Sequence, residues 1–180
     1  MKYKTLMGLA VVLLLSLCST TTSVSSTTSD HLEDDFKALF LKHWQVSRDF
    51  TLAVAQAMPA ESYSFKPNPQ EMGFGEMMIN LAQSNSDAFA RVAGTKELTK
   101  PAGNDKQTAI KFLAESFDQC AKDFAITTPE RFDKLFDIPE GRQATGLEVL
   151  WWAFTDTAHH RGQAEVYLRV KNITPPHYRF

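Results

Sequence analysis

The chain has 180 residues, of which 43% are hydrophobic and 22% are charged, and 19 Lys and Arg against 21 Asp and Glu give a formal net charge of −2. This composition is typical of a globular protein with one domain and a hydrophobic core. The near-neutral charge argues against nucleic acid as a partner, because proteins that bind phosphate backbones carry an excess of basic residues. Two cysteines are too few for a small scaffold held together by disulfides.

The N-terminus has the layout of a secretory signal. Lys2 and Lys4 precede an uncharged, mostly apolar run at residues 6–17, LMGLAVVLLLSL, which is short for a membrane span. We therefore predict that residues 1–18 direct export to the periplasm or the cell envelope. Cys18 follows the run directly, as in a bacterial lipoprotein signal, so attachment to the membrane through a lipid on Cys18 is one alternative. An uncleaved anchor and a mistaken start codon are the others.

A Ser/Thr-rich segment separates the predicted signal from the predicted domain. Residues 19–29, STTTSVSSTTS, carry no charge and only Val24 as an apolar side chain, so we expect a solvated linker. The folded domain is predicted at 30–180, where Asp30 and Glu33 can form a capping box. The first helix is predicted to end before Pro59. The residues expected on its inner face recur at three- and four-residue steps: Leu32, Phe36, Leu39, His43, Val46, Phe50, Val54 and Ala57.

Two further helices follow the same periodicity. The second is predicted at 74–92 and is closed by Gly94. The third begins at Asn104, with Gln107 three residues later, and its apolar stripe has the alternating steps of packed helices. The members of this stripe are Ile110, Leu113, Phe117, Cys120 and Phe124.

The last long helix is predicted at 146–170. Thr145 and Glu148 form a capping box at its start. Before it, residues 128–130 begin a short helical turn with proline at the first position, and 131–141 form a connection with some packing of its own.

This pattern predicts an all-α fold, a four-helix bundle in which each apolar stripe faces a shared core. We find no alternating run long enough to predict a strand. GxGxxG, P-loop, GxSxG and CxxC patterns are absent from the sequence, which argues against dinucleotide, nucleoside triphosphate and serine-hydrolase sites.

The residues best suited to chemistry lie on the last helix. Asp156 and His160 are spaced i,i+4, so they share one face of the helix and can point at the same ion. Gly162 stands inside this helix, where glycine costs about 1 kcal/mol relative to alanine. We therefore expect another helix to approach closely at Gly162.

Three segments resemble the DinB family, also called the DinB/YfiT-like superfamily. They are YSFKP at 63–67, GFGEMMINLA at 73–82 and HHRGQAEVYLRVKNITPP at 159–176. The resemblance covers nearly all of residues 30–178. It implies a four-helix bundle, commonly dimeric, with a divalent metal site. That site is usually made of three histidines that hold zinc or nickel, and some members are similar to thiol transferases.

Carried over residue by residue, the resemblance implies the metal ligands Asn80, Asp156 and His160, of which only the last is histidine. Zinc prefers imidazole and thiolate, so this set favours harder ions such as manganese, iron(II) or magnesium more than three histidines would. Glu76 or Glu165 completes the altered site if its side chain turns inward.

Two functions remain open. The first is a divalent-metal-dependent hydrolase or thiol-transferase-type enzyme that acts on a small molecule. The second is a non-catalytic, envelope-associated bundle that binds a partner or dimerises after losing the metal site. The resemblance makes a homodimer the expected assembly in both cases. DNA contact is suggested only by the family's name, and the charge pattern gives it no support.

Several other side chains have a structural and a functional interpretation. His43 is either a satisfied histidine of the bundle or an alternative ligand, and His159 points about 100° away from its neighbour around the helix, toward another helix or a dimer partner. Trp151 and Trp152, with Phe154, are expected in the core and at an interface rather than as a platform for substrate. Arg161 is expected to pair with a carboxylate across the bundle, and contact with an anionic substrate is the alternative. Cys120 lies on the apolar stripe of the third helix, so we expect a buried small hydrophobe rather than a catalytic thiol.

Overall fold

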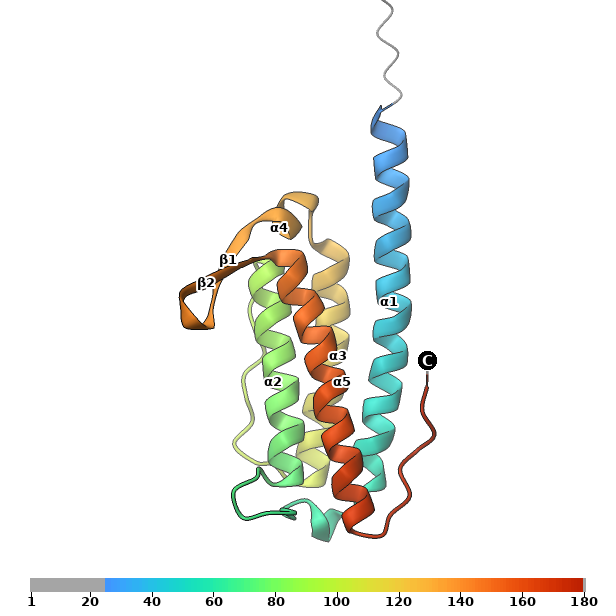
Figure 1. Cartoon of the computed structure of the whole chain (residues 1–180), viewed down its shortest axis with the longest axis vertical. Coiled ribbons are helices and arrows are strands. Elements are labelled where there is room, and N and C mark those ends of the chain that lie inside the picture. Colours follow the sequence, from blue (N-terminus) through green and yellow to red (C-terminus); the bar gives the residue numbers. More distant parts are fainter. Residues whose placement is uncertain (1–24, 180) are drawn as a thin grey trace, which may run out of the picture.

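A computed structural model describes residues 25–179 (Figure 1). The predicted signal at 1–18, the candidate lipid-bearing Cys18 and residues 19–24 of the predicted linker lie outside the described residues. Within residues 25–179, no helix combines the length and the apolar character needed to cross a membrane.

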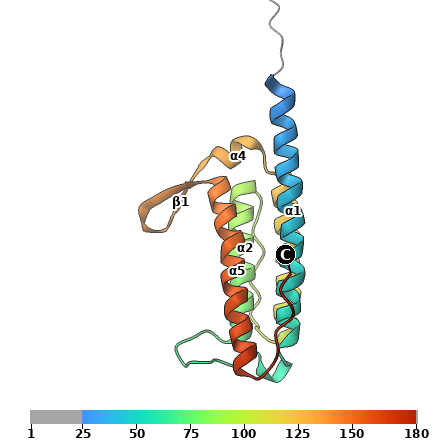
Figure 2. The same cartoon turned by 45° about the vertical axis from the view of Figure 1, so that its right-hand side comes forward.

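The described chain is mostly helical, as predicted. Four long helices lie side by side: α1 (Ser25–Ala57), α2 (Phe74–Ala93), α3 (Lys106–Ile126) and α5 (Gly146–Val170) (Figures 1 and 2). Helix α2 packs against α3 and α5, and α1 packs against the same two helices, so the four enclose one core. A 3-10 turn (Ala60–Ser62) follows α1, and the short helix α4 (Pro129–Asp133) begins at the predicted proline.

The ends of the helices agree with the sequence at α2 and α5 and differ at α1 and α3. Gly94 closes α2 with φ of 80°, and Thr145 with Glu148 forms the predicted capping box of α5. Helix α3 is capped by Asp105 rather than Asn104, because the Asp105 carboxylate accepts two backbone N–H groups. Helix α1 begins at Ser25, so Asp30 lies inside the helix and is not its N-cap. The serine and threonine residues before Asp30 can extend the helix because these residue types are only weakly unfavourable in it.

The expectation that no strand forms is wrong at one place. Strands β1 (Leu135–Ile138) and β2 (Arg142–Thr145) pair antiparallel and project from the end of the helices where α5 begins (Figure 1). Glu140 and Gly141 turn the chain with φ of 67° and 69°. Each strand has four residues, which is too short for an alternating pattern to stand out from the sequence.

The core is dominated by aromatic rings from α1, α2 and α3. The rings of Phe40 and Phe124 stack with their centres 3.9 Å apart, and Trp44 donates its indole N–H to the carbonyl oxygen of Phe117 over 3.0 Å. Burying a side chain of this size stabilises the fold by roughly 2–3 kcal/mol. Cys120 is fully buried in the same core, and burial raises the pKa of its thiol, which confirms that it is an unreactive hydrophobe.

Close backbone approach occurs at Gly75 and not at the predicted Gly162. A Cβ atom on Gly75 would overlap the carbonyl oxygen of Asn104, so the loop before α3 can lie against α2 only because this side chain is absent. Gly162 is exposed, and a Cβ atom there would meet no described atom within 4 Å. The expectation was wrong because Gly162 lies on the outer face of α5, opposite the face that contacts the other helices.

Candidate functional site

Asp156 and His160 lie together on one face of α5, as their spacing predicts. His160 Nε2 is 3.6 Å from Asp156 Oδ1, and the two side chains are 18% and 26% exposed. This distance is too long for a hydrogen bond. It is close to the separation of neighbouring ligands around a metal ion, which is roughly 3–3.5 Å when each bond is about 2.1 Å long.

Gln163 orients the imidazole of His160. The Nδ1 atom of His160 lies 2.9 Å from the amide oxygen of Gln163. In the neutral tautomer with its proton on Nδ1, the imidazole donates to Gln163 and the lone pair of Nε2 faces the carboxylate of Asp156. Two electron-rich atoms that face each other favour a cation between them. A hydrogen-bonded acceptor behind a histidine is also the usual support of a metal ligand.

Asn80 lies on α2 at the level of this pair. Helices α2 and α5 run antiparallel. Asn85 forms a hydrogen bond with Thr157. Phe74, which comes earlier in α2, contacts Tyr167, which comes later in α5, with ring centres 6.2 Å apart. This register puts Asn80 level with residue 162, one half turn beyond His160. The Asn80 side chain is half-buried and makes no hydrogen bond with any described residue, so its amide oxygen and nitrogen are available to a ligand.

Neither glutamate considered from the sequence completes the site. Glu76 is exposed, and its carboxylate accepts the backbone N–H of Gly73 over 3.2 Å to cap its own helix. Glu165 pairs with Arg169 at 3.4 Å. Glu165 follows His160 by five positions, which turns its side chain about 140° around the helix from that of His160.

The donor set fits a weakly held divalent cation better than a closed zinc site. In the part of the chain that the structure describes, no group of three or more His, Cys, Asp or Glu side chains could hold a metal ion. Asp156 and His160 supply two strong donors, and the neutral amide of Asn80 is a poor one for zinc. Ions that keep several water ligands and accept carboxylate oxygens, such as magnesium and manganese, match this set more closely.

The prediction that Arg161 pairs with a carboxylate is wrong within the described residues. Its Nη1 donates to the hydroxyl oxygens of Ser47 at 2.9 Å and Thr51 at 3.3 Å, and its guanidinium lies over the ring of Phe50 at 4.7 Å. Burial lowers the pKa of Arg161, and the charge of Glu165 partly opposes this. Arg161 points toward α1, where hydroxyl and aromatic side chains face it, so it serves packing.

The other candidates from the sequence are two histidines and two tryptophans. His43 is half-buried on α1, the helix that packs against the Arg161 side of α5. His159 is exposed, and its ring contacts that of its neighbour edge to face. Trp151 and Trp152 are 58% and 55% exposed, so the expectation that they belong to the core is wrong; the helical rotation that buries their neighbours turns both outward.

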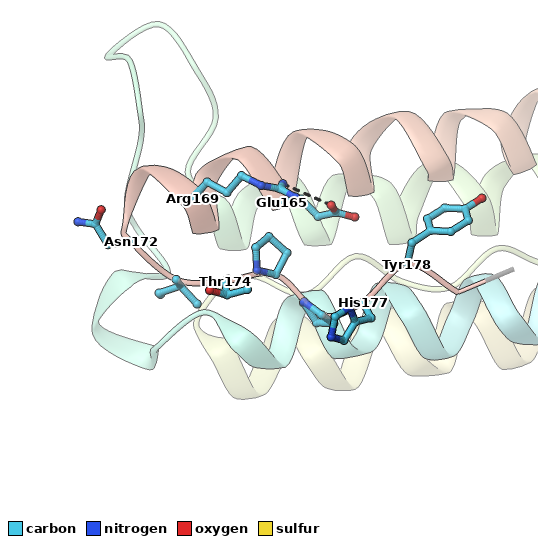
Figure 3. Close-up of a pocket in the computed structure, with 9 residues that line it drawn as sticks. Glu165, Arg169, Asn172, Thr174, His177 and Tyr178 are labelled. Carbon is cyan, nitrogen blue, oxygen red and sulfur yellow. Dashed lines mark hydrogen bonds and ion pairs between the residues drawn. The ribbon is translucent and has the colours of Figure 1, made fainter.

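A second polar site lies where the C-terminal tail leaves α5. Figure 3 shows Glu165 and Arg169 of α5 joined by their ion pair, with His177 and Tyr178 of the tail beside them in a pocket of about 550 Å³. The acidic and basic side chains neutralise each other here. His177 and Tyr178 are exposed to solvent, and the half-buried carboxylate of Glu165 is already engaged by Arg169.

Sequence reasoning missed Gln163 as the residue that orients the imidazole. Its position three residues after His160 was a usable signal, because side chains at i and i+3 are neighbours on a helix. The pairing of Asn85 with Thr157 had no such signal, because the two residues are 72 positions apart.

Comparison with known proteins gives one consistent result. A family model described as the DinB family matches residues 26–178. The uncharacterized protein YjoA of Bacillus subtilis strain 168 is 27% identical over 141 residues, which cover 74% of this chain and 90% of YjoA.

Two solved structures have a similar fold. The crystal structure of the DinB-like protein YjoA from Bacillus subtilis aligns with a TM-score of 0.62 at 23% identity and covers 77% of this chain and 96% of its own. A DinB-like protein from Bacillus cereus aligns with a TM-score of 0.66 at 19% identity and covers 78% and 95%. At these identities the likeness concerns the fold.

Proposed function

Because the chain belongs to the DinB family, we propose that it is an exported four-helix bundle of the DinB/YfiT type with an altered divalent-metal site. Asp156 and His160 would hold the ion, with Asn80 as a third, weaker donor. The observation that carries the proposal is the 3.6 Å separation between His160 Nε2 and Asp156 Oδ1, with the other ring nitrogen of His160 2.9 Å from the amide oxygen of Gln163. The proposed reaction is metal-dependent hydrolysis of a small molecule.

The residues of the chain have distinct roles in this proposal. Asp156 supplies the negative charge that attracts the cation, and His160 supplies a neutral nitrogen whose direction Gln163 fixes. Asn80 binds and orients a substrate oxygen or a water through its amide. A divalent ion, when bound, lowers the pKa of water or of a thiol and supplies a nucleophile near neutral pH.

Hydrolysis is preferred over thiol transfer because of the predicted export. Low-molecular-weight thiols are concentrated in the cytosol, whereas water is present everywhere. If the chain instead stays in the cytosol, thiol transfer becomes the corresponding reaction of the same site.

Metal titration tests the site directly. Chelator-treated full-length protein is titrated with Mn²⁺ and Zn²⁺ by calorimetry, and we expect one equivalent of Mn²⁺ to bind. Asp156→Ala and His160→Ala should each weaken binding at least about 10-fold. His177→Ala is the matched control, since this exposed histidine lies in the C-terminal tail, and it should stay within about 2-fold of the parent. Affinity that is indifferent to both site variants would overturn the proposal.

A non-catalytic bundle is the second candidate, and one observation favours it. The described residues contain no group of three or more strong metal donors, so a site weakened beyond use would leave only the scaffold. Hydrolysis of p-nitrophenyl esters and phosphates by the Mn²⁺-loaded protein separates the two. Turnover that disappears in both site variants supports the enzyme, whereas metal binding without turnover supports the scaffold.

A further inference from the structure

A cleft lies between the hairpin of β1 and β2 and the start of α5. Figure 1 shows the hairpin projecting from the bundle at the point where α5 begins. The cleft has a volume of about 470 Å³, which is within the range of sites that bind small molecules. Its apolar wall is made by side chains of both elements: Ile138, Pro139, Ala144, Val149 and Trp152.

The indole of Trp152 is the largest apolar group in the wall of this hairpin cleft. It is 55% exposed, and among the described residues it contacts no other aromatic ring. Trp151 differs, because it stacks on Phe154 with ring centres 6.1 Å apart and does not line the cleft. An exposed indole in a cleft offers its flat face to a planar apolar group.

One cation and one acid line the hairpin cleft beside the apolar side chains. Arg142 Nε is 3.5 Å from Glu140 Oε2, and the two side chains are 66% and 79% exposed, so this ion pair is weak. The guanidinium is therefore free to turn to a carboxylate, which it can bind through two parallel hydrogen bonds. The acid is Glu148, whose carboxylate already accepts the backbone N–H and the hydroxyl of Thr145 over 2.7 and 2.8 Å.

The hairpin cleft adjoins the candidate metal site along α5. Trp152 and Asp156 are spaced i,i+4, and so are Asp156 and His160, so the three side chains lie on successive turns of one side of the helix. Eight residues of helix span about 12 Å. A molecule of roughly this length therefore reaches from the cleft to the turn that carries His160.

We propose that the hairpin cleft is the substrate subsite of the Asp156 and His160 site, and that its ligand is a small molecule with a planar apolar group and a carboxylate. The apolar group stacks on Trp152, and the carboxylate binds Arg142. The bond to be hydrolysed, an ester or an amide, then lies further along α5, toward Asp156. The oxygen of water bonds to the acyl carbon, the bond to the alcohol oxygen or amine nitrogen breaks, and that leaving atom takes a proton from the water. The assignment of this bond rests on the proposed function, whereas binding in the cleft needs no metal ion.

Binding of phenylpropionate to chelator-treated full-length protein tests the cleft without a metal ion. The chain has three tryptophans, so Trp151→Phe and Trp152→Phe assign all the indole N–H signals in a proton–nitrogen NMR spectrum. We expect the Trp152 signal to shift on titration and the signal of the buried Trp44 to stay. Phenylpropionamide has a similar shape without the charge and should bind at least about 5-fold more weakly.

Two matched pairs of variants identify the side chains. Trp152→Ala and Arg142→Gln should each weaken phenylpropionate binding at least about 5-fold. Trp151→Ala removes a similarly exposed indole outside the cleft, and Arg169→Gln removes an exposed guanidinium, so both should stay within about 2-fold of the parent. Circular dichroism checks that all four variants are folded. Equal binding of the acid and the amide, or equal losses in Trp151→Ala and Trp152→Ala, would overturn the proposal.

Paramagnetic broadening tests whether the hairpin cleft belongs to the metal site. An unpaired electron broadens nuclear signals only at short range, so Mn²⁺ bound to the parent should broaden the proton signals of phenylpropionate. The same Mn²⁺ concentration with Asp156→Ala should broaden them less. Equal broadening in the two proteins, when the parent binds Mn²⁺, would overturn the link between cleft and site. A parent that binds no Mn²⁺ would overturn the proposed function and the position of the bond, and the metal-free titration alone then decides whether the cleft holds the acid.

Discussion

The side-chain amide of Asn85 donates to the hydroxyl oxygen of Thr157 over 2.9 Å, and both side chains are fully buried between α2 and α5. The Thr157 hydroxyl in turn donates to the carbonyl oxygen of Ala153 over 3.0 Å. This polar contact fixes how far α2 is shifted along α5. The shift determines that Asn80 lies level with the turn that follows His160, so a structural pair aligns the candidate site.

Thr157→Val should destabilise the protein by about 1–3 kcal/mol, because it leaves the amide of Asn85 buried without its acceptor. Urea unfolding followed by circular dichroism measures the change. Thr99→Val is the matched control at an exposed threonine and should change the free energy of unfolding by less than about 0.5 kcal/mol. Equal stabilities for the two variants would contradict the assigned contact.

Arg161→Lys should cost about 2 kcal/mol although the charge is kept. A lysine ammonium cannot stack on the ring of Phe50 or hold the planar contact with the hydroxyls of Ser47 and Thr51. Arg169→Lys makes the same exchange at a side chain that is 59% exposed and should be nearly neutral. Guanidinium unfolding of both variants checks the difference, and a neutral Arg161→Lys would show that the guanidinium packing is dispensable.

Two glycine substitutions should have opposite effects. Gly162→Ala should stabilise the protomer by up to about 1 kcal/mol, because alanine is the better helix former and the new methyl group meets no described atom. Gly75→Ala should destabilise by at least about 2 kcal/mol, since its methyl group would overlap the carbonyl oxygen of Asn104. Thermal unfolding at low protein concentration measures both, and shifts of the same sign would contradict the packing at one of the two positions.

The N-cap of α3 should make stability depend on acid pH. The hydroxyl of Thr108 and two backbone N–H groups hold the pKa of Asp105 below its ordinary value. A lowered folded-state pKa means that the stabilisation is present above the ordinary aspartate pKa of about 4 and is lost as the pH falls through the folded-state pKa.

Thr108→Val should therefore raise the pKa of Asp105 and move acid unfolding to higher pH. Carboxyl carbon NMR titration and circular dichroism against pH report the two effects. Ser84→Ala, on the exposed side of α2, should leave both unchanged. An unaltered pKa of Asp105 in Thr108→Val would contradict the hydrogen bond.

The sequence by itself determined the helices and one pair of site residues. Periodic apolar positions and capping residues depend on neighbours within a few positions, so the start of α5 at Gly146 and the meeting of Asp156 with His160 could be predicted without any tertiary contact. Four-residue strands carry too little pattern for the same treatment, and β1 and β2 were missed.

Tertiary structure decided everything that depends on rotation and register between helices. The rotation of α5 about its axis decides which side chains face its neighbours. It directs Arg161 to a hydroxyl instead of a carboxylate, leaves Trp151 exposed and leaves Gly162 uncrowded. The level of Asn80 depends on a buried contact across 72 residues. A local sequence pattern specifies a helix and its faces, but only the packed core, which minimises exposed apolar surface over all helices together, selects the partner of each face.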